Sequence, residues 1–93
     1  MKAIWSGAVI AESDATVVVE GTHYFPPSSV KQEHLRPSET QSTCGWKGVA
    51  NYCHVAVGDA VNDDAVWFYP DAKEKAKSFE GYYAFWRGVE IVE

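Results

Sequence analysis

Short alternating or β-branched runs, separated by turn residues, account for most of the sequence. Ser6-Gly7 has the composition of a two-residue hairpin turn. The valine-rich run Ala15–Glu20 predicts a strand buried on much of both faces, and the polar run Lys31–Leu35 predicts an exposed edge strand. The pattern predicts strands at Lys2–Trp5, Ala8–Ala11, Ala15–Glu20, His23–Phe25, Lys31–Leu35, Asn51–Val57, Ala65–Tyr69, Tyr82–Trp86 and Val89–Val92.

Turn and loop residues separate these runs. Arg36–Glu39 is expected to be a turn or loop, as is Gly58-Asp59. Arg87-Gly88 is expected to join the last two runs into a closing hairpin. Within Asn51–Val57, alternation places Asn51, Cys53, Val55 and Val57 on one side, and Tyr52, His54 and Ala56 on the other.

A single helix is predicted after Pro70. Asp71 can cap it, with Glu74 three residues later as in a capping box. Ala72, Ala76 and Phe79 fall at i, i+4 and i+7, which gives a narrow core-facing stripe, and Gly81 ends the helix. Many short strands with one short helix predict a small mainly-β barrel or folded sheet, as a single domain over residues 1–93.

Composition excludes several classes of function. The net charge of −5 disfavours general binding to nucleic acid. No stretch approaches the roughly 18 apolar residues of a membrane span, and the first residues lack the apolar core of a signal peptide. We therefore expect a cytoplasmic protein without membrane or nucleic-acid partners, in which Cys44 and Cys53 are reduced thiols.

The segment Ser42–Tyr52 holds the densest set of chemical groups, in what the pattern predicts to be a glycine-punctuated loop. A cation such as Lys47 near Cys44 would favour the nucleophilic thiolate, and Glu20 near Lys47 could act as a base. The loop could instead form an anion site with Lys47 as the countercharge. The ordinary alternatives stay open: a small buried thiol, a solvated lysine and a structural ion pair.

No metal or cofactor site is predicted. The three histidines lack ligand spacing, and the adjacent residues Cys53 and His54 face opposite ways on a strand. Asp63-Asp64 is interpreted as a hairpin turn between Val61 and Val66 rather than as a metal site.

The remaining candidates are aromatic. The content of four Trp and five Tyr in 93 residues is high. Large rings can line a ligand pocket, although most rings in a domain of this size belong to the core. A mixed outcome is predicted, with ring bodies buried and a few hydroxyls turned into a pocket. The candidates for stacking on a planar ligand are Trp46, Tyr52, Trp67, Tyr69 and Tyr82.

The sequence resembles domain-of-unknown-function family 427 over almost the whole chain, in the order and spacing of several short motifs. The matching motifs are Tyr24-Phe25-Pro26, Thr43-Cys44-x-x-Lys47-Gly48-x-Ala50-x-Tyr52, Ala65-x-Trp67 with Tyr69-Pro70, and Gly81-Tyr82-x-Ala84-Phe85. The resemblance implies a small bacterial domain that stands alone or is fused in tandem, mainly β, with a tent-like pair of folded antiparallel sheets. The sequence departs from the family at Gly45, where proline is usual, so this segment should be less rigid.

The family carries a nucleotidyltransferase label. Nucleotidyl transfer needs metal-bridging carboxylates and a phosphate-holding loop, and the sequence has neither pattern, so the resemblance supports the fold and pocket more than the reaction. The residues that the resemblance and the chemistry together nominate are Glu20, Cys44 and Lys47 as catalytic candidates, and Tyr24, Thr43, Gly48, Tyr52, Trp67 and Tyr69 as ligand-binding candidates.

Three functions remain open from the sequence. The first is a module with a polar-aromatic pocket for a small ligand that is anionic or nucleotide-like. The second is a metal-independent enzyme that uses Cys44, Lys47 and Glu20. The third is a non-catalytic domain that self-associates through its rings and edge strands as a homodimer.

Overall fold

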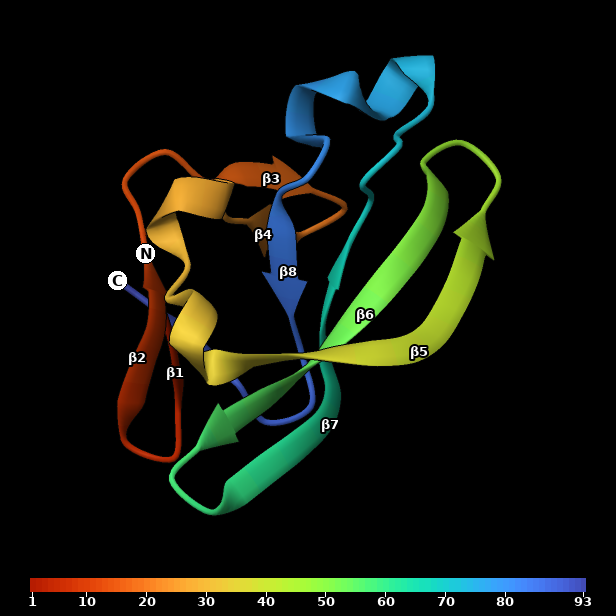
Figure 1. The fold of residues 1–93 in the computed structure, drawn as a ribbon. Helices are drawn as coiled ribbons and strands as arrows, with labels where there is room; N and C mark the ends of the chain where they lie inside the picture. Colours follow the sequence, from red (N-terminus) through yellow and green to blue (C-terminus); the bar gives the residue numbers. More distant parts are fainter.

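A computed structural model describes all of residues 1–93, and antiparallel strands make up most of it (Figure 1). The prediction of a mainly-β fold is confirmed, and the three sheets do not close into a barrel. None of the helices is long and apolar enough to span a membrane. The strands are β1 (Lys2–Trp5), β2 (Ala8–Glu12), β3 (Val17–Val19), β4 (Thr22–Tyr24), β5 (Leu35–Cys44), β6 (Gly48–Val57), β7 (Ala60–Phe68), β8 (Tyr83–Phe85) and β9 (Glu90–Val92). The 3₁₀ helices are η1 (Pro27–Ser29), η2 (Gln32–His34) and η3 (Glu74–Phe79).

The three-stranded sheet has the order β2-β1-β9 and brings the two ends of the chain side by side (Figure 1). The predicted first hairpin is confirmed: Ser6 and Gly7 have φ of 51° and 77°, the left-handed pair that a tight hairpin turn requires. The predicted closing hairpin is wrong. β8 pairs with β7, whereas β9 crosses over to pair with β1, because the chain turns between sheets at Arg87-Gly88.

The four-stranded sheet has the order β5-β6-β7-β8, and its edge strand β5 was mispredicted. Lys31–Leu35 is not an edge strand, since 3₁₀ helix η2 occupies most of it, and Arg36–Glu39 is not a loop but lies inside β5. β5 is exposed along most of its length, so it carries no hydrophobic alternation. Ser42–Tyr52 is likewise not a loop, because only Gly45–Lys47 separate β5 from β6.

The turn predicted at Asp63-Asp64 is also wrong, because both residues lie within β7. The turn between β6 and β7 is at Gly58-Asp59, as predicted. Cys53 pairs with Val66 and Val55 pairs with Asn62, so the single residue between them on β6 faces three residues of β7. This is a β-bulge, which a strict alternation rule does not anticipate.

The hairpin of β3 and β4 is the smallest sheet. The prediction that Ala15–Glu20 is buried on both faces is wrong: β3 spans three residues and Val18 is 57% exposed, because one face of this hairpin meets solvent. Glu20 (φ 53°) lies in the turn between the two strands. A bridge between Phe25 and Tyr83 attaches the hairpin to β8, and the hairpin lies behind β8 in Figure 1.

The predicted helix forms as the short 3₁₀ helix η3, and Asp71 does not cap it. The residue at the N-cap is Lys73, and no side chain caps it. The main-chain N–H of Ala72 instead donates to the Glu80 carboxylate. The predicted stripe is confirmed, since Ala72, Ala76 and Phe79 are all buried.

Two hydrophobic clusters divide the core. Adjacent residues on one strand belong to different clusters, as Val66 does to the first and Trp67 to the second, so the clusters lie on opposite faces of the four-stranded sheet. The first cluster comprises Ala3, Ile10, Ala11, Phe25, Val30, Leu35, Val55, Ala65, Val66, Phe85 and Val89. The second comprises Tyr24, Ala50, Tyr69, Ala72, Ala76, Phe79 and Ala84.

Candidate functional site

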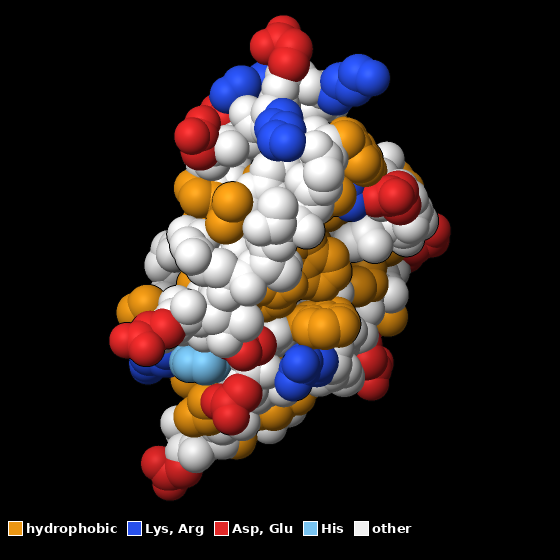
Figure 2. All heavy atoms as spheres, turned by 90° about the vertical axis from the view of Figure 1, so that its right-hand side faces the viewer, with side chains coloured by type: hydrophobic (Ala, Val, Ile, Leu, Met, Phe, Trp, Pro, Cys, Tyr) orange, Lys and Arg blue, Asp and Glu red, His pale blue; other side chains and the backbone are white.

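An open cavity of about 210 Å³ lies between the β3–β4 hairpin and the four-stranded sheet, on the sheet face that carries the second hydrophobic cluster. The face of the molecule seen in Figure 2 carries a central band of hydrophobic side chains with charged side chains of both signs at its edges. The cavity is lined by Val19, Glu20, Thr22, Tyr24, Lys47, Tyr52, Trp67, Tyr69 and Trp86.

The charged part of this cavity is one ion pair. Lys47 Nζ donates to Glu20 Oε1, which joins the turn after β5 to the turn after β3. The Lys47 side chain is 11% exposed and that of Glu20 is 62% exposed. The ammonium group is therefore largely removed from water, while its countercharge stands at the rim.

The local backbone explains why Lys47 is buried. Its carbonyl accepts the N–H of Lys73 at 3.0 Å, which ties the turn to the segment before η3. The next residue, Gly48, has φ of 118°, and a Cβ there would lie 3.2 Å from the Asp71 carbonyl oxygen. A side chain at position 48 would push these two segments apart, so this glycine allows the close approach that covers Lys47.

Five aromatic rings supply most of the remaining wall. Tyr24 and Trp67 pack edge to face with ring centres 6.2 Å apart, and Trp67 and Trp86 do so at 5.8 Å. The Trp67 indole N–H donates to the Tyr24 hydroxyl at 3.2 Å. The Tyr52 hydroxyl forms a hydrogen bond with Ser42 Oγ at 2.9 Å.

The electrostatics of the site keep its donors protonated. Burial lowers the pKa of Lys47, but the hydrogen bond that Lys47 donates to Glu20 and the nearby Tyr24 and Cys44 groups outweigh it, so the pKa lies above the ordinary 10.5. Burial, followed by the neighbouring Tyr24 and Cys44, raises the pKa of Tyr69 well above the ordinary value for tyrosine. At neutral pH the cavity therefore presents the Lys47 ammonium group and the Tyr69 hydroxyl as hydrogen-bond donors.

The structure gathers six of the nine candidate residues around the cavity: Glu20, Tyr24, Lys47, Tyr52, Trp67 and Tyr69. Three candidates do not line it. Thr43 is exposed on β5 opposite Val49, and Gly48 acts in packing, as described above. Cys44 is half-buried and packs against the second cluster, near enough to Lys47 and Tyr69 to affect their pKa values.

Sequence reasoning missed three cavity residues: Val19, Thr22 and Trp86. Val19 and Thr22 flank the Glu20 turn and pair with each other, a register that the predicted strand boundaries did not give. Trp86 follows β8, and the sequence pattern predicts it only as the last residue of the strand Tyr82–Trp86. Among the other aromatic candidates, Trp46 lies 38% exposed beside Phe79 and Tyr82 packs against the second cluster.

The cysteines and acidic residues are dispersed. Cys44 and Cys53 are both free thiols, and burial raises the pKa of Cys53. No group of three or more His, Cys, Asp or Glu side chains is arranged to hold a metal ion.

Comparison with known proteins identifies the family. A family model described as "Domain of unknown function (DUF427)", with a nucleotidyltransferase label, matches residues 1–93. No curated protein matches the chain. Because the family model spans the whole chain, this protein belongs to the DUF427 family.

Proposed function

We propose that this protein is a binding module whose cavity takes a small planar ligand with an anionic or strongly accepting substituent. The observation that carries the proposal is the nearly buried Lys47 ammonium, whose only charged partner is an exposed carboxylate, beside five aromatic rings. An incoming anion could replace Glu20 at Lys47 without burying a second charge, and a planar ring could pack on Trp67 and Trp86.

The size of the cavity narrows the class of ligand. A volume of about 210 Å³ is below the roughly 300–1,000 Å³ of typical drug-sized sites, so it suits a single or fused ring system. A nucleobase or an aromatic carboxylate is of this size. A nucleoside triphosphate would have to leave its phosphates outside the cavity. The only cation in the cavity lining is Lys47, which is already paired with Glu20. The proposal is therefore nucleotide-like recognition of a ring rather than nucleotidyl transfer.

The test is a binding screen read by tryptophan fluorescence, since Trp67 and Trp86 line the cavity. The panel comprises nucleobases, nucleoside monophosphates and aromatic carboxylates. We expect at least one class to quench the fluorescence saturably, and Lys47→Met to weaken that binding by roughly tenfold or more through loss of a charge-assisted hydrogen bond. Lys75→Met is the matched control, because Lys75 is exposed and outside the cavity. A panel without saturable binding, or equal binding by Lys47→Met, would refute the proposal.

Acid–base catalysis without a metal is a second candidate, favoured by the contact between Glu20 and Lys47 at the cavity rim. Glu20 would accept a proton from a bound ligand, and Lys47 would stabilise the negative charge that develops. Exchange of ligand C–H for deuterium in D₂O, followed by NMR, tests this for any ligand that the screen finds. Exchange that Glu20→Gln does not slow would exclude Glu20 as the base.

A further inference from the structure

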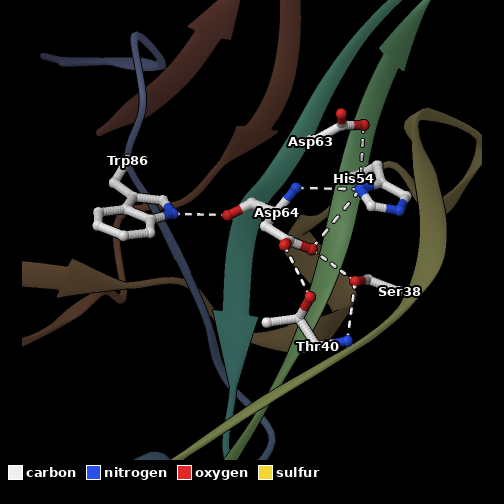
Figure 3. Close-up of polar contacts among 6 residues, drawn as sticks. All are labelled: Ser38, Thr40, His54, Asp63, Asp64 and Trp86. Atoms are coloured by element: carbon white, nitrogen blue, oxygen red, sulfur yellow. Dashed lines mark hydrogen bonds and ion pairs between the residues drawn. The ribbon is translucent and has the colours of Figure 1, made fainter.

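The polar residues around the β7 bulge converge on one backbone unit, that of Asp64 (Figure 3). The carboxylate of Asp64 accepts Ser38 Oγ at 2.5 Å and Thr40 Oγ1 at 2.8 Å, both from strand β5. The main-chain N–H of Asp64 donates to His54 Nδ1 at 3.0 Å. These three contacts hold a non-glycine residue with φ of 54°, in the left-handed region.

The fourth contact connects the bulge to the cavity. The carbonyl oxygen of Asp64 accepts the indole N–H of Trp86 at 2.6 Å, and the main-chain N–H of Trp86 donates to the carbonyl of Ala65 at 3.0 Å. Trp86 is 43% exposed and forms part of the cavity wall through its contact with Trp67. The Asp64 carbonyl is therefore one of three groups that hold this partly exposed ring, together with the edge-to-face contact with Trp67 and the Arg87 guanidinium 4.7 Å from the Trp86 ring centre.

His54 is the only imidazole in this network, and an imidazole has a neutral and a protonated form. Its Nδ1 accepts the Asp64 N–H, so the ring is neutral with its proton on Nε2. A protonated ring carries hydrogen on both nitrogens and cannot accept that bond. Protonation would remove the contact that holds the Asp64 peptide in place and would turn Nδ1–H toward a carboxylate.

Charged groups of both signs face His54. The Asp63 and Asp64 carboxylates lie 3.5 Å and 3.7 Å from its Nδ1. Arg36 is the residue paired with His54 across β5 and β6, and its guanidinium donates to the Glu33 and Leu35 carbonyls. Hydrogen bonds from Ser38 and Thr40 hold the pKa of Asp64 below its ordinary value, so its carboxylate is charged at neutral and mildly acidic pH.

We propose that His54 is a positioning residue for the cavity: its neutral form holds Trp86 in the cavity wall through the Asp64 bulge, and its protonation releases that ring. The effect on ligand affinity rests on the binding function proposed above, whereas the effect on Trp86 does not. Affinity for a planar ligand should therefore fall at mildly acidic pH although neither Lys47 nor Asp64 changes charge there.

The experiment is a pH titration of the ligand-free protein followed by ¹H–¹⁵N NMR of its four indole groups, with Trp86 assigned from Trp86→Phe. We expect the Trp86 indole signal to shift with the same midpoint as the His54 ring protons. His54→Asn places an oxygen acceptor near the position of Nδ1 without a titrating group, so its Trp86 signal should be independent of pH. His34→Asn removes a histidine outside this network and should leave the shift intact.

Two further measurements keep the proposal testable. Ser38→Ala removes a hydroxyl from the Asp64 carboxylate and should displace the Trp86 signal even at high pH. For any ligand that the screen finds, the wild type should lose roughly three- to tenfold in affinity below the His54 midpoint, the factor of one hydrogen bond, and His54→Asn should not. A Trp86 signal that ignores the His54 titration, or one that still moves in His54→Asn, would overturn the proposal. A screen without any ligand would refute only the binding function.

Discussion

The Lys47–Glu20 pair should be asymmetric in its effect on stability. Glu20→Gln leaves the ammonium group of Lys47, a residue 9% exposed, without a charged partner. Breaking a fully buried pair in this way costs about 3–5 kcal/mol, whereas an exposed pair contributes about 0–1 kcal/mol. Since Glu20 is 62% exposed and Lys47 is not, we expect an intermediate loss of about 1–2 kcal/mol.

Lys47→Met should cost less than removal of its partner. Methionine is close in length, keeps the apolar contacts of the lysine stem and removes the charge that must be desolvated. We expect the free energy of unfolding to stay within about 1 kcal/mol of wild type, and the Glu20→Gln/Lys47→Met double variant to resemble Lys47→Met. A lysine that can be lost at so small a cost in stability, yet is kept nearly buried, would be explained by a ligand.

Urea unfolding followed by circular dichroism measures these differences, and each 1 kcal/mol corresponds to about 4–8 °C in Tm for a chain of this size. The pKa of Lys47 is raised, so its contribution is complete below the ordinary value of 10.5 and is lost as pH rises through the folded value. The two variants should therefore differ from wild type by the same amount from about pH 6 to 9. A loss above about 2 kcal/mol for Lys47→Met, together with a smaller loss for Glu20→Gln, would refute this reasoning.

Gly48→Ala should lower the free energy of unfolding by about 1–3 kcal/mol, because its φ of 118° is unfavourable for a side chain and the new Cβ would lie 3.2 Å from a main-chain oxygen. Gly45→Ala is the control: Gly45 has open space around it, so thermal unfolding of this variant should be close to that of wild type. The lowered pKa of Asp64 gives stability that is present above the ordinary value of 3.8 and lost as pH falls through the folded value, so Ser38→Ala should flatten the acid limb of a stability–pH curve; an unchanged acid limb would contradict this. Burial raises the pKa of Cys53, so this thiol should be the slower to react with a disulfide reagent at pH 8, and Cys53→Ser should remove the slow phase and leave the fast one.

The parts of the fold that the sequence predicted are those with local signals. Ser6-Gly7 supplied the two positive φ angles of a hairpin, and the predicted stripe is buried, with Ala76 and Phe79 on η3 and Ala72 just before it. β5 was missed because an exposed edge strand needs no hydrophobic alternation, and its polar residues look like a loop. The bulge at Asp64 was missed because its conformation depends on hydroxyls and a histidine from two other strands.

The sequence predicted which residue types form the candidate site, but not which of these side chains meet in space. Lys47 and Glu20 are 27 positions apart and lie in turns of two different sheets, which the Phe25–Tyr83 bridge connects. Trp86 had no sequence signal beyond being an aromatic residue at the end of a strand. Its contacts in the wall, with the Asp64 carbonyl and the Trp67 ring, are tertiary contacts.

Strand alternation explains why the same segments build both the core and the cavity. β6 and β7 each send one residue to the first cluster and its neighbour to the cavity, as in Cys53 beside Tyr52 and Val66 beside Trp67. The chain does the same after β4, where Phe25 fills the first cluster and pairs with Tyr83. That bridge fixes the neighbouring Tyr24 over the opposite face, in the cavity wall. The aromatic residues of this small chain therefore fill the first core cluster and also line the cavity. A one-residue change of strand register would exchange core and cavity residues.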